Sequence, residues 1–261
     1  GNGRLYIMSF QCSGLLNHPA LPVKYLKGLQ IEITWQSAAV ALSTGTDYTI
    51  NYPRFYYEQS SVSPALLAEL DRRYKAGDIN IHFESWNTKS YTTTSGQENI
   101  QFEINTPKYD VKSLFVVRRL TSALQSGSDS HRFVDDDFAE GVGAEDASYF
   151  QLEWNSQKIP VERVASCERA YVELLQATGN YNNYLVAPVS FQNFKLYSHI
   201  LGMDLSKLKG DSFSGVSTQG GKNIRFEQVL IAHNTTYRYD AFLNFSVVVN
   251  LSENRGVVVR S

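Results

Sequence analysis

The chain has 261 residues and a formal net charge of −2, with 24 Lys and Arg against 26 Asp and Glu. This near balance lacks the basic excess of a typical nucleic-acid-binding protein. Two cysteines, Cys12 and Cys167, do not suggest a disulfide framework, and no apolar run approaches the roughly 18–20 residues of a membrane helix. Aromatic residues make up 13% of the chain, which favours β-strands.

The first half is predicted to consist mainly of strands in which apolar and polar side chains alternate. Pro53 interrupts one of them and indicates an edge strand or a bulge. Thr-rich polar sequence from Trp86 to Gln97 is typical of an exposed hairpin loop. The predicted strands are Leu5–Phe10, Leu29–Trp35, Tyr48–Glu58, Ile79–Phe83 and Ile100–Ile104.

One helix is predicted within this half. Ser63 is a natural N-cap, Pro64 suits the first helical position, and Gly77 follows as a C-terminal stop. The apolar face is formed by Leu66, Leu67, Leu70 and Tyr74, at spacings of three and four residues.

A run of apolar residues from Leu114 to Val117, extended by the stem of Arg118, is too apolar for a half-exposed strand. It predicts a strand that is buried on both faces. After Arg119 the chain becomes rich in Ser, Gly and Asp, so this strand is expected to be the last core element of the first half.

The second half is predicted to repeat this organisation after a linker or surface loop at 122–147. Its helix is expected to run from near Pro160 to Thr178, stopped by Gly179. A loop-rich stretch is expected from Gly202 to Gly221. Its strands are predicted at Tyr149–Trp154, Tyr184–Tyr197, Lys222–Ala232, Tyr237–Asn250 and Val257–Val259.

Neither heptads nor βαβ alternation is visible, which disfavours a parallel α/β fold. The prediction is therefore all-β: two antiparallel β-sandwiches in series, or one and a half, each with a short helix insertion. The expected divisions are 1–121, 122–147 and 148–261.

No catalytic, cofactor-binding or metal site is predicted. Gly210–Asp211–Ser212 is followed by Phe213, where a serine protease needs glycine. The acidic residues from Asp135 to Asp146 do not match an EF-hand and are interpreted as a solvated linker. Gly220–Gly221–Lys222 is interpreted as a hairpin turn. Isolated surface or packed histidines are expected at His18, His82, His131, His199 and His233, and sequons, which arise easily by chance, begin at Asn234, Asn244 and Asn250.

Short motifs follow one another along nearly the whole chain. They are Leu21–Leu26 before Leu29–Trp35, Val111–Val117, Ala147–Phe150, Phe194–Tyr197 with Gly210, Ser214 and Gly215, and Tyr237–Asn250 with Asn254–Gly256. Their order is similar to that of double jelly-roll major capsid proteins, a family that includes proteins of nucleocytoplasmic large DNA viruses, virophages, and the polinton-like and adintovirus groups. Ser198–His199 departs from the Ser-Phe of the family, and the usual start of the first jelly roll is missing.

The resemblance implies two successive jelly rolls, the first lacking its N-terminal part, in a structural protein without enzymatic activity. Family members form homotrimers with a pseudo-hexagonal outline that tile an icosahedral shell. The implied partners are neighbouring capsomers and minor capsid or penton proteins, without direct nucleic-acid contact, small-molecule substrate or cofactor. The implied location is the virion capsid, assembled inside the host cell.

Three long polar segments, Trp86–Gln97, Ser122–Asp146 and Leu205–Gly221, are expected to form tower loops or trimer contacts. The main alternative is a surface β-sandwich that binds carbohydrate, in which exposed rings such as Trp86 would stack on sugars. A hydrolase on a jelly-roll scaffold is a third reading, but the converging carboxylates or histidines it needs cannot be assembled from the spacing.

Overall fold

The computed structural model describes residues 14–16, 21–26, 30–38, 47–51, 53–124, 133, 148–181, 187, 189–206, 214–230, 235–254 and 256–260. The chain groups into two compact units, which are described separately. The larger comprises Thr34–Ile50 and Trp86–Phe245, and the smaller comprises Gly1–Ile33, Asn51–Ser85 and Ser246–Ser261.

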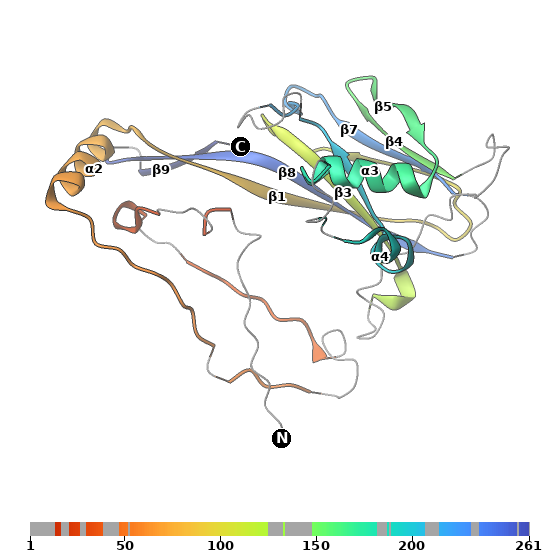
Figure 1. Ribbon diagram of the computed structural model, residues 1–261, viewed down its shortest axis with the longest axis horizontal. Coiled ribbons are helices and arrows are strands. Elements are labelled where there is room, and N and C mark those ends of the chain that lie inside the picture. Colours follow the sequence, from red (N-terminus) through yellow and green to blue (C-terminus); the bar gives the residue numbers. More distant parts are fainter. Residues whose placement is uncertain are drawn as a thin grey trace. The chain divides into compact units, whose positions relative to one another are not determined.

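The described strands form two sheets in which every given strand pair is antiparallel, and the predicted all-β class is confirmed (Figure 1). The first sheet has the order β1-β8-β3-β6, with β9 paired to β8, and the second has the order β2-β7-β4-β5. The first sheet is built from β1 (Ile79–Thr92), β8 (Tyr237–Ser252), β3 (Val111–Leu120), β6 (Ile200–Asp204) and β9 (Gly256–Arg260). The second is built from β2 (Asn99–Ile104), β7 (Ile224–Val229), β4 (Tyr149–Trp154) and β5 (Gln157–Val164).

Both sheets combine strands from the two sides of residues 122–147. In the first sheet, Val117 of β3 lies opposite Asp240 of β8, and in the second, Phe102 of β2 lies opposite Phe226 of β7. The predicted division into 1–121 and 148–261 therefore does not follow the strand pairing. Among the described residues the two halves share one pair of sheets, because long-range pairing decides sheet membership and local sequence does not display it.

Strand β3 confirms the prediction of a strand buried on both faces. It lies between β8 and β6, and Val116 and Val117, which point to opposite faces, are 0% and 4% exposed. Arg118 is also buried, with 2% exposure, and its guanidinium lies 4.6 Å from the centre of the Tyr237 ring. A cation held against an aromatic face is a favourable arrangement for a buried arginine.

An aromatic cluster fills the space between the sheets in the larger unit. The Phe226 ring, which has no exposed surface, lies 5.1 Å from Phe102, 6.4 Å from Phe150 and 6.2 Å from Tyr239. Tyr91 stacks on Phe102 at 5.3 Å. These centroid distances suit the offset and tilted geometries that aromatic rings prefer.

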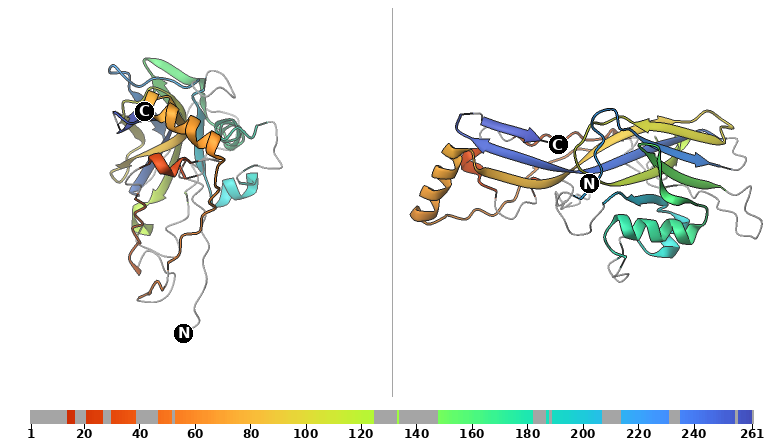
Figure 2. Two further views of the ribbon diagram at one scale, coloured as in Figure 1. Left: turned by 90° about the vertical axis from the view of Figure 1, so that its left-hand side faces the viewer. Right: turned by 90° about the horizontal axis from the view of Figure 1, so that it is seen from above.

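Helix α3 (Cys167–Ala177) packs on β6 on the face turned away from this aromatic core (Figure 2). Gly202 permits the approach, because a β-carbon there would lie 2.9 Å from the Cα atom of Leu174. The helix begins later than predicted. Pro160 belongs to β5, and Ser166 is the N-cap, its hydroxyl accepting a hydrogen bond from the Arg169 amide.

The smaller unit contains α2 (Pro64–Ala76), which confirms the predicted helix and both of its ends. The Ser63 hydroxyl accepts a hydrogen bond from the Leu66 amide, and Gly77 adopts the left-handed conformation with φ of 78°. Tyr25, in the short 3-10 helix η1 (Val23–Tyr25), stacks on Tyr74 at 4.6 Å. Among the described helices, none is long and apolar enough to cross a membrane.

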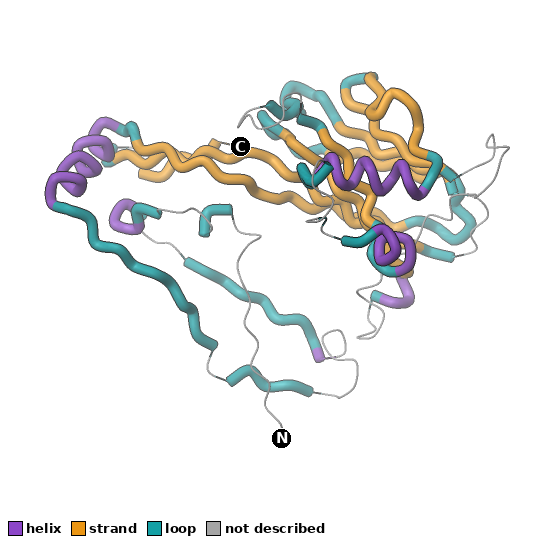
Figure 3. Tube along the Cα trace, viewed as in Figure 1, coloured by secondary structure: helices purple, strands orange, loops and turns teal. Residues whose placement is uncertain are grey.

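Several other predictions were wrong. The described residues of the predicted strands Leu29–Trp35 and Tyr48–Glu58 belong to no strand, as the loop colouring of Figure 3 shows. Strand β1 continues to Thr92 through the segment predicted as a hairpin loop. Part of the expected strand at Tyr184–Tyr197 is helix α4 (Phe191–Leu196), and β6 lies partly in the stretch predicted as loop-rich. The 3-10 helix η2 (Thr121–Ala123) follows β3.

The start of β3 is held in place by contacts with the segment around Gly215. Val111 and Val216 exchange two backbone hydrogen bonds of 2.8 Å, and the Gly215 amide donates to the Asp110 carboxylate at 2.6 Å. A β-carbon on Gly215 would lie 2.3 Å from the Val111 carbonyl oxygen. Such contact with backbone cannot be relieved by a rotamer change.

We expect Gly215→Ala to lower the free energy of unfolding by about 2 kcal/mol, because the segment that carries residue 215 must then move away from Val111 of β3. Urea denaturation followed by circular dichroism measures this change. Ser217→Ala, two residues away, removes only hydrogen bonds of 3.3 and 3.5 Å and should change it by less than about 0.5 kcal/mol. Equal stability of the two variants would show that the close approach of Gly215 to Val111 does not contribute to stability.

Candidate interaction surface

The outer face of the second sheet carries a row of alternating charges. Glu103 of β2 lies opposite Arg225 of β7, Arg225 lies opposite Glu153 of β4, and Glu153 lies opposite Lys158 of β5. Because side chains that are opposite one another in an antiparallel pair project to the same face, the four side chains form a line across all four strands. We call this line, Glu103–Arg225–Glu153–Lys158, the charge row.

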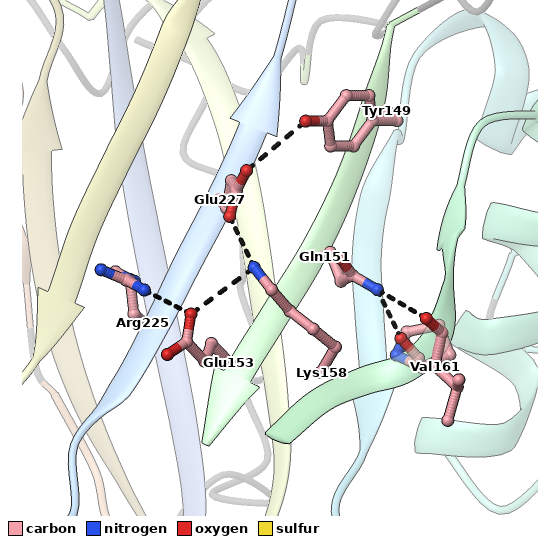
Figure 4. A network of polar contacts seen from close by, with 8 residues as sticks. Tyr149, Gln151, Glu153, Lys158, Val161, Arg225 and Glu227 are labelled. Carbon is pink, nitrogen blue, oxygen red and sulfur yellow. Dashed lines mark hydrogen bonds and ion pairs between the residues drawn. The ribbon is translucent and has the colours of Figure 1, made fainter. Parts of the chain in front are cut away.

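Direct contacts join three members of the charge row, Arg225, Glu153 and Lys158, to Glu227 and Tyr149 in one network (Figure 4). The Arg225 guanidinium donates to the Glu153 carboxylate, and the Lys158 ammonium lies 3.5 Å from the same carboxylate oxygen. Lys158 also donates to Glu227 at 2.8 Å, and the Tyr149 hydroxyl lies 3.4 Å from the other oxygen of Glu227. The network thus spans three of the four strands with direct contacts.

The hydrogen bonds of the network stabilise the charged forms of Glu153, Lys158 and Arg225. The hydrogen bond from Arg225 lowers the pKa of Glu153. The hydrogen bond to Glu227 raises the pKa of Lys158, and the hydrogen bond to Glu153 raises that of Arg225. These three side chains therefore stay ionised at neutral pH.

An open depression of about 540 Å³ adjoins the charge row on β4, β5 and β7. Gln151 lines it and donates to the backbone carbonyls of Pro160 and Val161 at 2.7 and 3.1 Å. The Arg163 guanidinium lies 4.8 Å from the Tyr149 ring, and Val161 is 88% exposed. The mixture of charged, aromatic and aliphatic groups suits contact with another protein surface.

A second polar cluster, centred on Asp240, lies on the outer face of the first sheet. The side chain of Asp240 is 3% exposed and accepts hydrogen bonds from Ser90, Arg119 and Arg238. Burial alone would raise the pKa of this carboxyl, but the three hydrogen bonds and the charge of Arg119 outweigh burial, and the pKa is lowered. The carboxylate ties together β1, β3 and β8.

The lowered pKa predicts an acid-sensitive contribution to stability. Since the folded-state pKa lies below the unfolded-state value of about 4, the contribution is present above that value and is lost as the pH falls through the folded-state pKa. We expect Asp240→Asn to be less stable at neutral pH and to lose less stability between about pH 5 and pH 2. Urea denaturation across this range measures both effects; parallel pH profiles for the two proteins would contradict the role of Asp240.

The structure describes only some of the residues considered from sequence. His82 is exposed on β1, while His199 is buried with its ring 4.5 Å from Phe194. Asn244 and Asn250 lie within β8, and Gly220 and Gly221 form the predicted turn with φ of 68° and 81°. His18, His131, His233, Asn234, the acidic residues 135–146 and Gly210–Asp211–Ser212 lie outside the described residues.

The three segments expected to be tower loops have mixed outcomes. Most of Trp86–Gln97 lies in β1, so this segment is mainly strand and not a tower loop, while a trimer contact there stays a prediction. Trp86 is 41% exposed, and its ring lies 5.7 Å from that of Phe115. The described parts of Leu205–Gly221 are loop and turn, and most of Ser122–Asp146 lies outside the described residues. Sugar binding by Trp86 stays a prediction.

The charge row was not predicted from sequence. Its members alternate with apolar residues on each strand, so a set of outward-facing side chains could be identified, such as Arg225 and Glu227 beside Ile224 and Phe226. The sequence cannot show that four strands align these side chains, because alignment depends on the register between segments more than 50 residues apart. Groups of His, Cys, Asp and Glu able to hold a metal ion are absent among the described residues.

Comparison with known proteins finds no protein-family model and no curated protein that matches the chain. Solved viral capsid structures are similar to it. The Faustovirus major capsid protein is 9% identical with a TM-score of 0.48, over 73% of this chain and 36% of that one. A quasi-atomic model of the PBCV-1 virus capsid is 10% identical with a TM-score of 0.48, over 75% of this chain and 54% of that one.

A third structure, PBCV-1 VP54 fitted into a cryo-EM reconstruction of the virophage Sputnik, is 7% identical with a TM-score of 0.45. The match covers 70% of this chain and 51% of that one. The chain therefore spans between 36% and 54% of the length of the three structures.

Proposed function

We propose that the chain is a structural subunit of a viral capsid, of the major capsid protein type, and performs no reaction. The observation that carries this proposal is where the sequence motifs lie in the fold. Val111–Val117 forms most of the central strand β3, Tyr149 and Phe150 open β4, and Tyr237–Asn250 forms nearly all of β8. These three motifs thus lie in strands that hold the sheets together, whereas residues 30–35 belong to no strand and Phe194–Tyr197 lies mostly in α4.

The proposed assembly is a homotrimer located in the virion and formed inside the host cell. Its further partners are neighbouring capsomers and minor capsid or penton proteins. Trimers with a pseudo-hexagonal outline would tile an icosahedral shell. Sheet faces that carry several ion pairs, such as the one with the charge row, support such a role, because they offer contact surfaces with defined charge.

The outline of the trimer distinguishes a chain that contributes one sandwich from a chain that contributes two. The described strands contribute one pair of sheets per chain, so three chains would supply three sandwiches from these residues and a triangular outline. A pseudo-hexagonal outline needs a second sandwich from every chain. Particle images of the purified protein distinguish the two outcomes.

The test begins with the mass of the full chain in solution, measured by light scattering after gel filtration. We expect a species of three times the mass of one chain, and then class averages with threefold symmetry in electron microscopy. A stable monomer that binds glycans, with binding lost on Trp86→Ala, would overturn the proposal in favour of the carbohydrate-binding alternative.

A further inference from the structure

The charge row on the second sheet has a property that single ion pairs do not have. Read from β2 to β5, its signs are negative, positive, negative and positive, from Glu103, Arg225, Glu153 and Lys158 in turn. Read in the opposite direction, from β5 to β2, the row has the opposite charge at every position. The row is therefore complementary to an inverted copy of itself.

We infer that this face binds the same face of a second copy of the chain. A two-fold axis that runs parallel to the strands, between β7 and β4, reverses the row in the partner. Glu103 then faces Lys158 of the partner subunit, and Arg225 faces Glu153 of the partner subunit. A two-fold contact repeats both pairs, so all four charges meet opposite charges.

On the two inner strands, β7 and β4, the same two-fold rotation brings no like charges together in the next two rows. Glu227 of β7 shares its row with Gln151 of β4, and across the axis it faces that uncharged amide. One row further, Val229 faces Tyr149, which joins an aliphatic side chain to an aromatic ring. The opposite choice, an axis along the row, would place each charge against its own like charge and is excluded by repulsion.

The side chains are available for such a contact within the part of the chain that the structure describes. Arg225 and Lys158 are 41% and 40% exposed, so their outward surfaces remain open after they have paired within the sheet. With strands about 4.8 Å apart, the row is about 14 Å long, which is within the width of an ordinary interface. Because its charges are solvated, the contact is weak between isolated chains and is strengthened where many copies are held in an array.

This contact does not depend on the proposed capsid role. It joins two copies about a two-fold axis, whereas the proposed trimer has a threefold axis, and it can be measured without a shell. If the capsid proposal fails, the two-fold association can still be present. If the two-fold association is absent, the capsid proposal can still hold.

Sedimentation velocity of the full chain at rising concentration, in about 50 mM and about 500 mM NaCl, measures the association. We expect reversible pairing of the smallest species, monomer or trimer, that weakens in the higher salt. Lys158→Glu should weaken it about tenfold, since its new carboxylate faces Glu103 of the partner subunit. Lys75→Glu, which makes the same charge change on α2, should leave it unchanged and is the matched control.

A sharper variant inverts the whole row through E103K, R225E, E153R and K158E. The inverted protein should pair with itself as wild type does, because its reversed row again places opposite charges together. Circular dichroism establishes that each variant is folded. Absence of salt-sensitive pairing in wild type, equal loss with Lys75→Glu, or failure of the folded inverted protein to pair with itself would overturn the inference.

Discussion

Replacing Phe226 by alanine is expected to lower the free energy of unfolding by about 3–5 kcal/mol. Phe226 contacts aromatic rings from three other strands, Phe102 of β2, Phe150 of β4 and Tyr239 of β8, and none of its surface is exposed. Truncation leaves a cavity at the point where the two sheets meet. Urea denaturation followed by circular dichroism should show a midpoint lower by about 1 M or more.

Two controls make this result specific. Phe226→Leu keeps most of the volume and should cost about 1 kcal/mol. Tyr181→Ala removes an aromatic ring that is 52% exposed and should cost less than about 0.5 kcal/mol. A Phe226→Ala protein as stable as Phe226→Leu would show that these rings are not the centre of the core.

The second large effect is expected at Gly202, where α3 approaches β6. Gly202→Val would place its β-carbon 2.9 Å from the Cα atom of Leu174 and 3.2 Å from the β-carbon of Ala177. Because the nearest atom belongs to the helix backbone, α3 must move as a whole. We expect a loss of about 3 kcal/mol, at the upper end for overpacking.

Hydrogen exchange locates this effect. The amides of α3 should exchange faster in Gly202→Val, while those of β4 and β7 keep their protection. Gly220→Ala is the control, since its β-carbon meets nothing within 4 Å and its cost, about 1 kcal/mol, comes from a φ of 68° alone. Unchanged exchange in α3 would contradict the packing described here.

Local signals predicted several elements well. Ser63, Pro64 and Gly77 set both ends of α2, since capping and the left-handed stop depend only on adjacent residues. The apolar run Leu114–Val117 likewise predicted the central position of β3. By contrast, Pro160 suggested a helix start, yet the N-cap is Ser166, and the preceding residues form β5 by pairing with β4.

Long-range pairing accounts for what the sequence did not predict. The polar residues after Trp86 look like a loop, but the contact between Ser90 and Asp240 shows that they are one face of a strand beside β8. In the same way, residues 30–37 have a strand pattern but take part in no described sheet. Alternation indicates that a segment can be a strand, and pairing partners decide whether it is one.

The interleaving of early and late strands also determines when the protein can fold. Val117 lies opposite Asp240, so β3 leaves the ribosome long before β8, the strand that flanks it on one side. At about 5–20 residues per second, the delay is on the order of ten seconds. Strand β6, its neighbour on the other side, also follows β3 by about 80 residues, so for most of this time Leu114 and Val116 lack both neighbouring strands. A topology so rich in distant contacts folds slowly. Synthesis at low temperature, or with chaperones that bind nascent chains, should therefore raise the yield of soluble protein.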